Sequence, residues 1–204
     1  MGSRIMHLII ANGIAEKLSI QDQTSFLLGG VAPDAVRSKK EKEASHFYAG
    51  TTKNYTRRID YDSFFHKYES FMDSPFILGY YTHLIADDSW LNGFFLPWLK
   101  NRIEHDQTIL SLYHHDFKLL NAKLLHHYDK EQQFLSILNQ KASIPKLEEV
   151  TEENVLIFKK LIFDDMVYPH QDLHAELQVF TFDQIIGYVE TAIEKGVFFL
   201  EKHY

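Results

Sequence analysis

The stretch that begins at Ser74-Pro75 limits the possible folds more than any other part of the chain. Serine and proline are typical of a helix start there, because serine caps the first turn and proline fits the first helical position. Residues 75–92 are apolar on almost every side of a helical projection. Such a helix is stable only when other elements surround it. The sequence therefore predicts a buried central helix at residues 75–92, which we expect Gly93 to end.

Most of the remaining chain has helical rather than strand periodicity. Further helical segments are expected at 4–18, 22–28, 60–72, 96–140, 151–166 and 181–202. The polar segment 35–56 is interpreted as a surface loop with one helical turn, and strand-like alternation is scarce. We predict an all-α fold in which residues 1–204 form one multi-helix domain, since this length is typical of single domains.

The composition excludes several classes of site. The chain has no cysteine, which rules out disulfides, thiolate catalysis and cysteine-ligated zinc or iron–sulfur centres. A formal net charge of −7, without a long block of Lys and Arg, gives no strong signal for binding along a nucleic-acid backbone. The longest apolar runs are shorter than a membrane span, and no signal-peptide pattern is found, so we expect a cytoplasmic protein.

Two polar residues lie on the most apolar helix. His83 and Asp87 are four residues apart and therefore share one helix face. A buried ionised carboxylate needs a partner, which can be a hydrogen-bond donor, a cation or a metal ion. The pair is thus either a metal-binding pair or a His–Asp hydrogen bond that stabilises the helix.

Three further segments hold potential ligands. His7 lies among apolar residues of the first helix, Asp34 follows a Gly-Gly-Val-Ala-Pro turn, and His46 lies beside an aromatic residue in a polar segment. Each also has a simpler interpretation: a core histidine for His7, a helix cap for Asp34 and an exposed side chain for His46.

Taken together, these segments resemble a known family, both in the residues they contain and in their order along the chain. The matching segments are Met6-His7-Leu8-Ile9-Ile10-Ala11, Phe26-Leu27-Leu28-Gly29-Gly30-Val31-Ala32-Pro33-Asp34, Ser45-His46-Phe47 and Gly79-Tyr80-Tyr81-Thr82-His83-Leu84-Ile85-Ala86-Asp87. They are similar to small bacterial members of the zinc-dependent phospholipase C family, which is related in fold to single-strand nucleases of the P1 type. The strong part of the resemblance covers residues 6–90.

The resemblance implies a ligand set. The positions that match Asp34, His46, His83 and Asp87 hold one zinc ion in the family, with Asp87 bridging to a second ion that His7 would ligate. Asp34 is also the candidate catalytic residue, which would orient or deprotonate the attacking water.

Two features depart from the family pattern. Secreted members use an N-terminal tryptophan as a metal ligand, whereas Met6 and further residues precede His7 here. The histidine that follows the Asp87 position in classical members is missing as well, since Asp88, Ser89 and Trp90 come next. Candidates for a second site lie further downstream and are His115, Asp116, His127 and Glu131.

The sequence thus predicts a metal-dependent hydrolase that acts on a small-molecule phosphate ester through metal-activated water. Zinc is the expected cofactor, while iron, manganese and nickel also suit His/Asp ligands. Two alternatives remain open. One is a His–Asp type metal phosphohydrolase built on the dipeptides His105-Asp106 or His115-Asp116, and the other is a non-catalytic helical module that binds metal or a partner.

Overall fold

The computed structural model describes residues 3–202 and confirms the all-α fold. The α-helices are α1 (Arg4–Lys17), α2 (Gln23–Gly29), α3 (Lys39–Ser45), α4 (Tyr61–Lys67), α5 (Pro75–Trp90), α6 (Lys100–His105), α7 (Thr108–Tyr128), α8 (Glu131–Leu138), α9 (Glu152–Asp165) and α10 (Phe182–Glu201). Three short 3-10 helices are η1 (Ala32–Asp34), η2 (Glu69–Phe71) and η4 (His170–Leu173), and η3 (Leu91–Leu99) is π-helical. Within residues 3–202, the strands are the antiparallel pair β1 (Tyr48–Ala49) and β2 (Arg58–Ile59).

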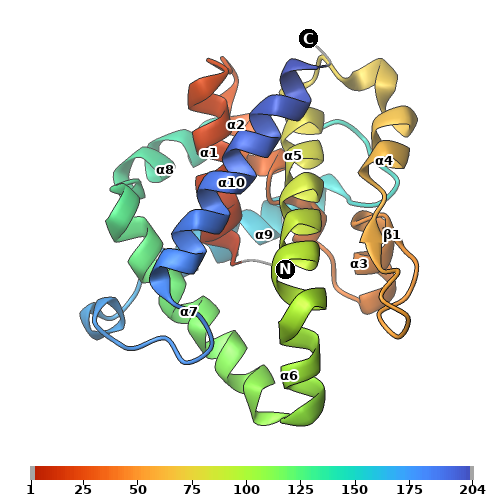
Figure 1. The fold of residues 1–204 in the computed structure, drawn as a ribbon. Coiled ribbons are helices and arrows are strands. Elements are labelled where there is room, and N and C mark those ends of the chain that lie inside the picture. Colours follow the sequence, from red (N-terminus) through yellow and green to blue (C-terminus); the bar gives the residue numbers. More distant parts are fainter. Residues whose placement is uncertain (1–2, 203–204) are drawn as a thin grey trace.

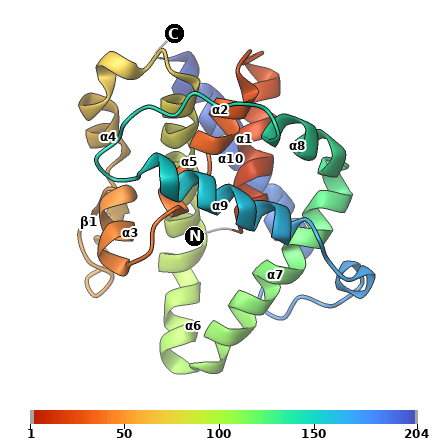
Figure 2. The same ribbon diagram turned by 180° about the vertical axis from the view of Figure 1, so that it is seen from behind.

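Helix α5 forms the centre of the molecule, as its sequence predicts. It packs against α1, α2, α4 and α10, and Figure 1 shows α10 running beside it while Figure 2 shows α9 on the opposite side. Every residue from Phe76 to Asp87 is buried. Each large apolar side chain buried in this way contributes about 1.5–3 kcal/mol. Apolar burial therefore accounts for the position of α5, and its polar residues are carried into the interior with it.

The backbones of α2 and α5 touch at two glycines. A Cβ atom on Gly79 would lie 2.0 Å from the carbonyl oxygen of Phe26, and one on Gly29 would lie 2.0 Å from that of Phe76. No side chain fits at either position, so the helices approach more closely than packed side chains would allow. This approach brings the carbonyl of Gly30 against α5, where it meets His83.

Two local expectations are wrong. Gly93 does not end the central helix, because the chain continues as the π-helical segment η3 and then as α6. Pro97 lies inside η3 and has no N–H to donate, so a regular α-helical hydrogen-bond ladder cannot pass through it. The segment expected to be a loop contains α3, whose start is fixed by a capping box between Ser38 and Glu41.

The C-terminal half covers the N-terminal helices. Helix α7 packs on α1, and α10 packs on both α1 and α5. Thr181 begins α10 with a second capping box, in which its hydroxyl accepts a hydrogen bond from the Gln184 backbone N–H at 3.2 Å. In the described part of the chain, no helix has both the length and the apolar character needed to cross a membrane.

Candidate metal centre

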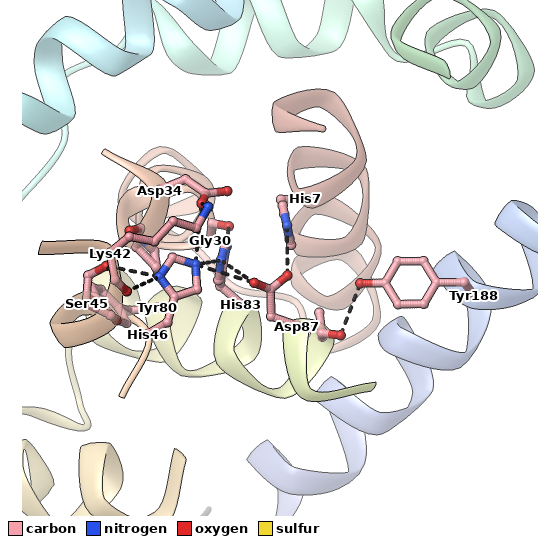
Figure 3. A network of polar contacts seen from close by, with 12 residues as sticks. His7, Gly30, Asp34, Lys42, Ser45, His46, Tyr80, His83, Asp87 and Tyr188 are labelled. Atoms are coloured by element: carbon pink, nitrogen blue, oxygen red, sulfur yellow. Dashed lines mark hydrogen bonds and ion pairs between the residues drawn. The ribbon is translucent and has the colours of Figure 1, made fainter. Parts of the chain in front are cut away.

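The five residues expected to bind metal come together from four elements. His7 lies on α1, Asp34 ends η1, His46 follows α3, and His83 and Asp87 lie on α5. Figure 3 shows their side chains pointing toward one another. Their donor atoms form two overlapping groups, one of His7, His83 and Asp87 and one of Asp34, His46 and His83. The three histidines and Asp87 are buried, and the Asp34 side chain is 12% exposed.

A backbone hydrogen bond orients His83. Its Nδ1 lies 2.9 Å from the carbonyl oxygen of Gly30, so Nδ1 carries the proton and donates it. The lone pair of Nε2 then points into the cluster. Burial is the main reason why the pKa of His83 lies well below the usual value, and the neighbouring His7 lowers it further. A neutral imidazole held by a backbone carbonyl is the usual form of a metal-ligating histidine.

His46 is oriented in the same way. Its Nδ1 lies 3.0 Å from the carbonyl oxygen of Lys42 and 3.0 Å from the Ser45 hydroxyl. That hydroxyl donates to the carbonyl of Pro33 at 2.7 Å, so Nδ1 of His46 is again the donor. Its Nε2 lies 3.3 Å from Nε2 of His83. Two such lone pairs repel each other unless a proton or a cation lies between them.

The two carboxylates complete the cluster. Oδ1 of Asp34 and Oδ2 of Asp87 each lie 3.4 Å from Nε2 of His46, and Oδ1 of Asp87 lies 3.3 Å from Nε2 of His7. Burial alone would raise the pKa of both carboxyl groups. Their contacts with His46 and other positively polarised groups outweigh it, so both pKa values lie well below the usual range. The cluster therefore holds two negative charges in a mostly buried place.

The distances from His46 to its neighbouring donors are those expected between ligands of a tetrahedral ion. Around a zinc ion with ligands at about 2.0–2.2 Å, neighbouring donors lie about 3.3–3.6 Å apart. The distances from Nε2 of His46 to donors of Asp34, His83 and Asp87 are 3.4, 3.3 and 3.4 Å. Nε2 of His83 lies 3.8 Å from Oδ2 of Asp87. Nε2 of His46 thus lies at ligand-like distances from donors of Asp34, His83 and Asp87, and the other oxygen of Asp87 faces His7.

The candidates for a downstream site lie in other surroundings. Asp116 is buried, and its carboxylate accepts hydrogen bonds from the backbone N–H groups of Gln178, Val179 and Phe180 at 2.8, 2.7 and 3.2 Å. It thereby fixes the segment before α10. The other three candidates are His115 and His127, which are exposed on α7, and Glu131, which begins α8. The structure brings none of the four into either donor group.

Sequence reasoning missed Lys42. Its ammonium group lies 2.6 Å from Oδ1 of Asp34, and its carbonyl orients His46. Burial would lower the pKa of Lys42, but the charge of Asp34 outweighs burial and raises it. The available signal was spacing, because Lys42 precedes His46 by four residues, which is about one helical turn.

The comparison with known families agrees with this geometry. Residues 6–90 match the zinc dependent phospholipase C family. The expected resemblance is thus confirmed over the segment that the motifs indicated. This phospholipase C-like segment ends with α5 and contains all five clustered residues, whereas Asp116 and the other downstream candidates lie beyond it. No curated protein and no solved structure matches the chain significantly.

Proposed function

We propose that this protein is a zinc-dependent phosphoesterase. Asp34, His46, His83 and Asp87 would hold one ion, and His7 would help to hold a neighbouring ion. The observation that carries the proposal is that Nε2 of His46 lies 3.4, 3.3 and 3.4 Å from donors of Asp34, His83 and Asp87, with the Nε2 atoms of both histidines turned inward by backbone carbonyls. The match of residues 6–90 to the phospholipase C family supports the same chemistry.

Zinc bound there would polarise a phosphoryl oxygen and lower the pKa of water from ~15.7 toward ~7. The residues of the chain supply the rest. Asp34 is the cluster member nearest to solvent, and its ionised carboxylate is able to orient the attacking water and accept its proton. His83 and His46 would offer Nε2 to the ion, because their Nδ1 atoms face the carbonyl oxygens of Gly30 and Lys42. The substrate class is a phosphate ester, and iron, manganese or nickel are the other ions that this donor set suits.

The alternative His–Asp phosphohydrolase has less support. Asp116 is engaged by three backbone N–H groups, and Asp106 instead accepts hydrogen bonds from the backbone and hydroxyl of Thr108 at 2.9 and 2.7 Å. Neither carboxylate belongs to the donor groups of the cluster. The non-catalytic module is the outcome if metal binds but no ester is cleaved. The cytoplasmic location expected from the sequence stays a prediction.

The first test is metal content. We expect protein purified without added metal, or dialysed against zinc and then buffer, to retain zinc in elemental analysis. Asp87→Ala should release the ion, because it removes the carboxylate that contacts both His7 and His46. His174→Ala is the matched control, since His174 is exposed after η4 and lies outside both donor groups. Retention of zinc by Asp87→Ala would contradict the assigned ligands.

The second test is catalysis. Zinc-, manganese- and iron-loaded protein is screened against phosphomonoesters, phosphodiesters, phospholipids and single-stranded nucleic acid. We expect turnover of at least one phosphate ester, and we expect Asp34→Asn to abolish most of it while circular dichroism shows an unchanged fold. If loaded protein cleaves nothing in this screen, the catalytic proposal is wrong and the binding module takes its place.

A further inference from the structure

Lys42 covers the solvent side of the cluster. Its ammonium group contacts Oδ1 of Asp34, the same oxygen that faces Nε2 of His46. Figure 3 shows the Lys42 side chain extending past His46 to reach this carboxylate. The Lys42 side chain is 38% exposed, while those of His46, His83 and Asp87 are 0–1% exposed. In the described structure, Lys42 therefore acts as a counter-ion to Asp34 at the edge of the buried site.

This ion pair and a metal ion compete for the same oxygen. If a cation bound Oδ1 of Asp34 at about 2.0–2.2 Å while Lys42 kept its contact of 2.6 Å, the two positive centres would lie within about 5 Å of each other. Repulsion at that distance in a partly buried place is strong. Occupation of the cluster by a divalent ion therefore favours release of Lys42 from Asp34.

A released Lys42 has a cavity to enter. Lys42 and Asp34 both line a hollow of about 520 Å³, together with Arg4, His114 and Lys118. Arg4 is already bound to Asp165 through two hydrogen bonds of 2.6 and 3.0 Å. Lys42, in contrast, contacts the proposed ligand Asp34 directly, and it would lose this partner if Asp34 bound metal. An anionic group beside the cluster would supply a new partner.

We propose that Lys42 exchanges Asp34 for a phosphate oxygen when the cluster binds its metal ion. In the metal-free protein it neutralises Asp34, and in the loaded protein it binds the phosphate group of the substrate and holds it against the ion. An ammonium group suits this role because its hydrogen bonds to phosphate are charge-assisted. This inference rests on the proposed phosphoesterase function, and it adds a residue that favours anionic phosphate groups over neutral ones.

The first experiment measures zinc affinity in competition with a chromophoric chelator. Lys42→Met removes the competing charge, so we expect it to bind zinc about tenfold more tightly than the unchanged chain. Lys40→Met is the matched control, because Lys40 is an exposed residue of the same helix and its loss changes the net charge equally. Lys42→Arg keeps the charge and should bind zinc as the unchanged chain does.

The second experiment measures binding of inorganic phosphate to the zinc-loaded proteins by calorimetry. Lys42→Met should weaken phosphate binding about tenfold, through loss of a charge-assisted hydrogen bond. Lys40→Met should leave it unchanged, and Lys42→Arg should retain most of it. If Lys42→Met does not fold by circular dichroism, Lys42→Gln replaces it, since an amide can still donate to Asp34 without carrying a charge.

The outcomes separate this inference from the proposed function. Tighter zinc binding together with weaker phosphate binding in Lys42→Met supports the exchange. Unchanged or weaker zinc affinity, or unchanged phosphate binding, overturns it, and the phosphoesterase proposal survives if the unchanged chain still binds zinc and cleaves an ester. If neither the unchanged chain nor Lys42→Met binds zinc, both proposals fail.

Discussion

Ser45 connects the two segments that carry Asp34 and His46. Its hydroxyl is fully buried and donates a hydrogen bond of 2.7 Å to the carbonyl of Pro33. Pro33 precedes Asp34, and Ser45 precedes His46, so this one bond fixes the spacing of two proposed ligands. The substitution Ser45→Ala removes the donor and adds no bulk. It therefore tests whether second-sphere contacts hold the site.

The expected cost follows from the burial of this bond. Depriving a buried carbonyl of its donor costs about 1–3 kcal/mol. For a chain of this length, each kcal/mol lowers the melting temperature by about 2–4 °C. We expect the metal-free Ser45→Ala protein to melt about 2–12 °C lower than the unchanged chain. Loss of an outer-shell partner also weakens metal binding by about 10- to 100-fold, so zinc affinity should fall within that range.

Two assays measure these effects separately. Thermal melts in the presence of a chelator give the stability of the metal-free protein, and chelator competition gives the zinc affinity. Ser111→Ala is the control, because Ser111 is exposed on α7 and lies away from the cluster in the chain. If Ser45→Ala lost stability but kept full zinc affinity, the bond would serve the fold alone. If neither quantity changed, the reasoning from buried hydrogen bonds would be refuted.

Three other perturbations test the fold and the charges of the site. Burial and His7 keep the pKa of His83 below its unfolded value of about 6.5, so the unfolded state takes up the proton first as the pH falls. In urea unfolding of the metal-free protein, the free energy of unfolding should therefore decrease as the pH drops below about 6.5. This decrease should be less steep in His83→Gln. Gly79→Ala would place a Cβ atom 2.0 Å from a backbone oxygen and should destabilise the protein by about 2 kcal/mol or more in the same denaturation assay. Gly187→Ala is the control, because nothing lies within 4 Å of a Cβ atom there, and it should stabilise α10 by about 0.5–1 kcal/mol. Asp116→Ala should lower the melting temperature sharply, because three backbone N–H donors lose their acceptor. The zinc content of the folded protein should not change. Loss of zinc would make Asp116 a ligand candidate again.

The sequence predicts those features that depend on neighbouring residues. Pro75 begins α5 as predicted, although the Ser74 side chain makes no capping hydrogen bond. The apolar residues of α5 predict its burial, and a spacing of four predicts that His83 and Asp87 share a face. These rules concern one helix, so they hold before anything is known of the rest. They fail at Gly93, because propensity does not predict that a π-helical register will carry the chain to Leu99.

The same rules do not predict the contacts between segments that are distant in the sequence. The position of His7 depends on how α1 packs on α2 and α5, and no local pattern encodes that packing. The family resemblance supplied the ligand order instead, and the match over residues 6–90 agrees with it. Asp116 shows the opposite error. Its His-Asp dipeptide suggested a metal ligand, but the partners of its carboxylate are backbone N–H groups some sixty residues away, the nearest being that of Val179 at 2.7 Å.

Charge balance unites the features of the cluster. Asp34 and Asp87 together bring two negative charges into a mostly buried place, and Lys42 neutralises one of them from the solvent side. The facing Nε2 atoms of His46 and His83, at 3.3 Å, require a positive centre between them, because each Nδ1 proton is already donated to a carbonyl. A divalent ion bound there would by itself balance the charges of the two carboxylates. Lys42 would then no longer be needed to neutralise Asp34, and its ammonium group could bind a phosphate oxygen instead.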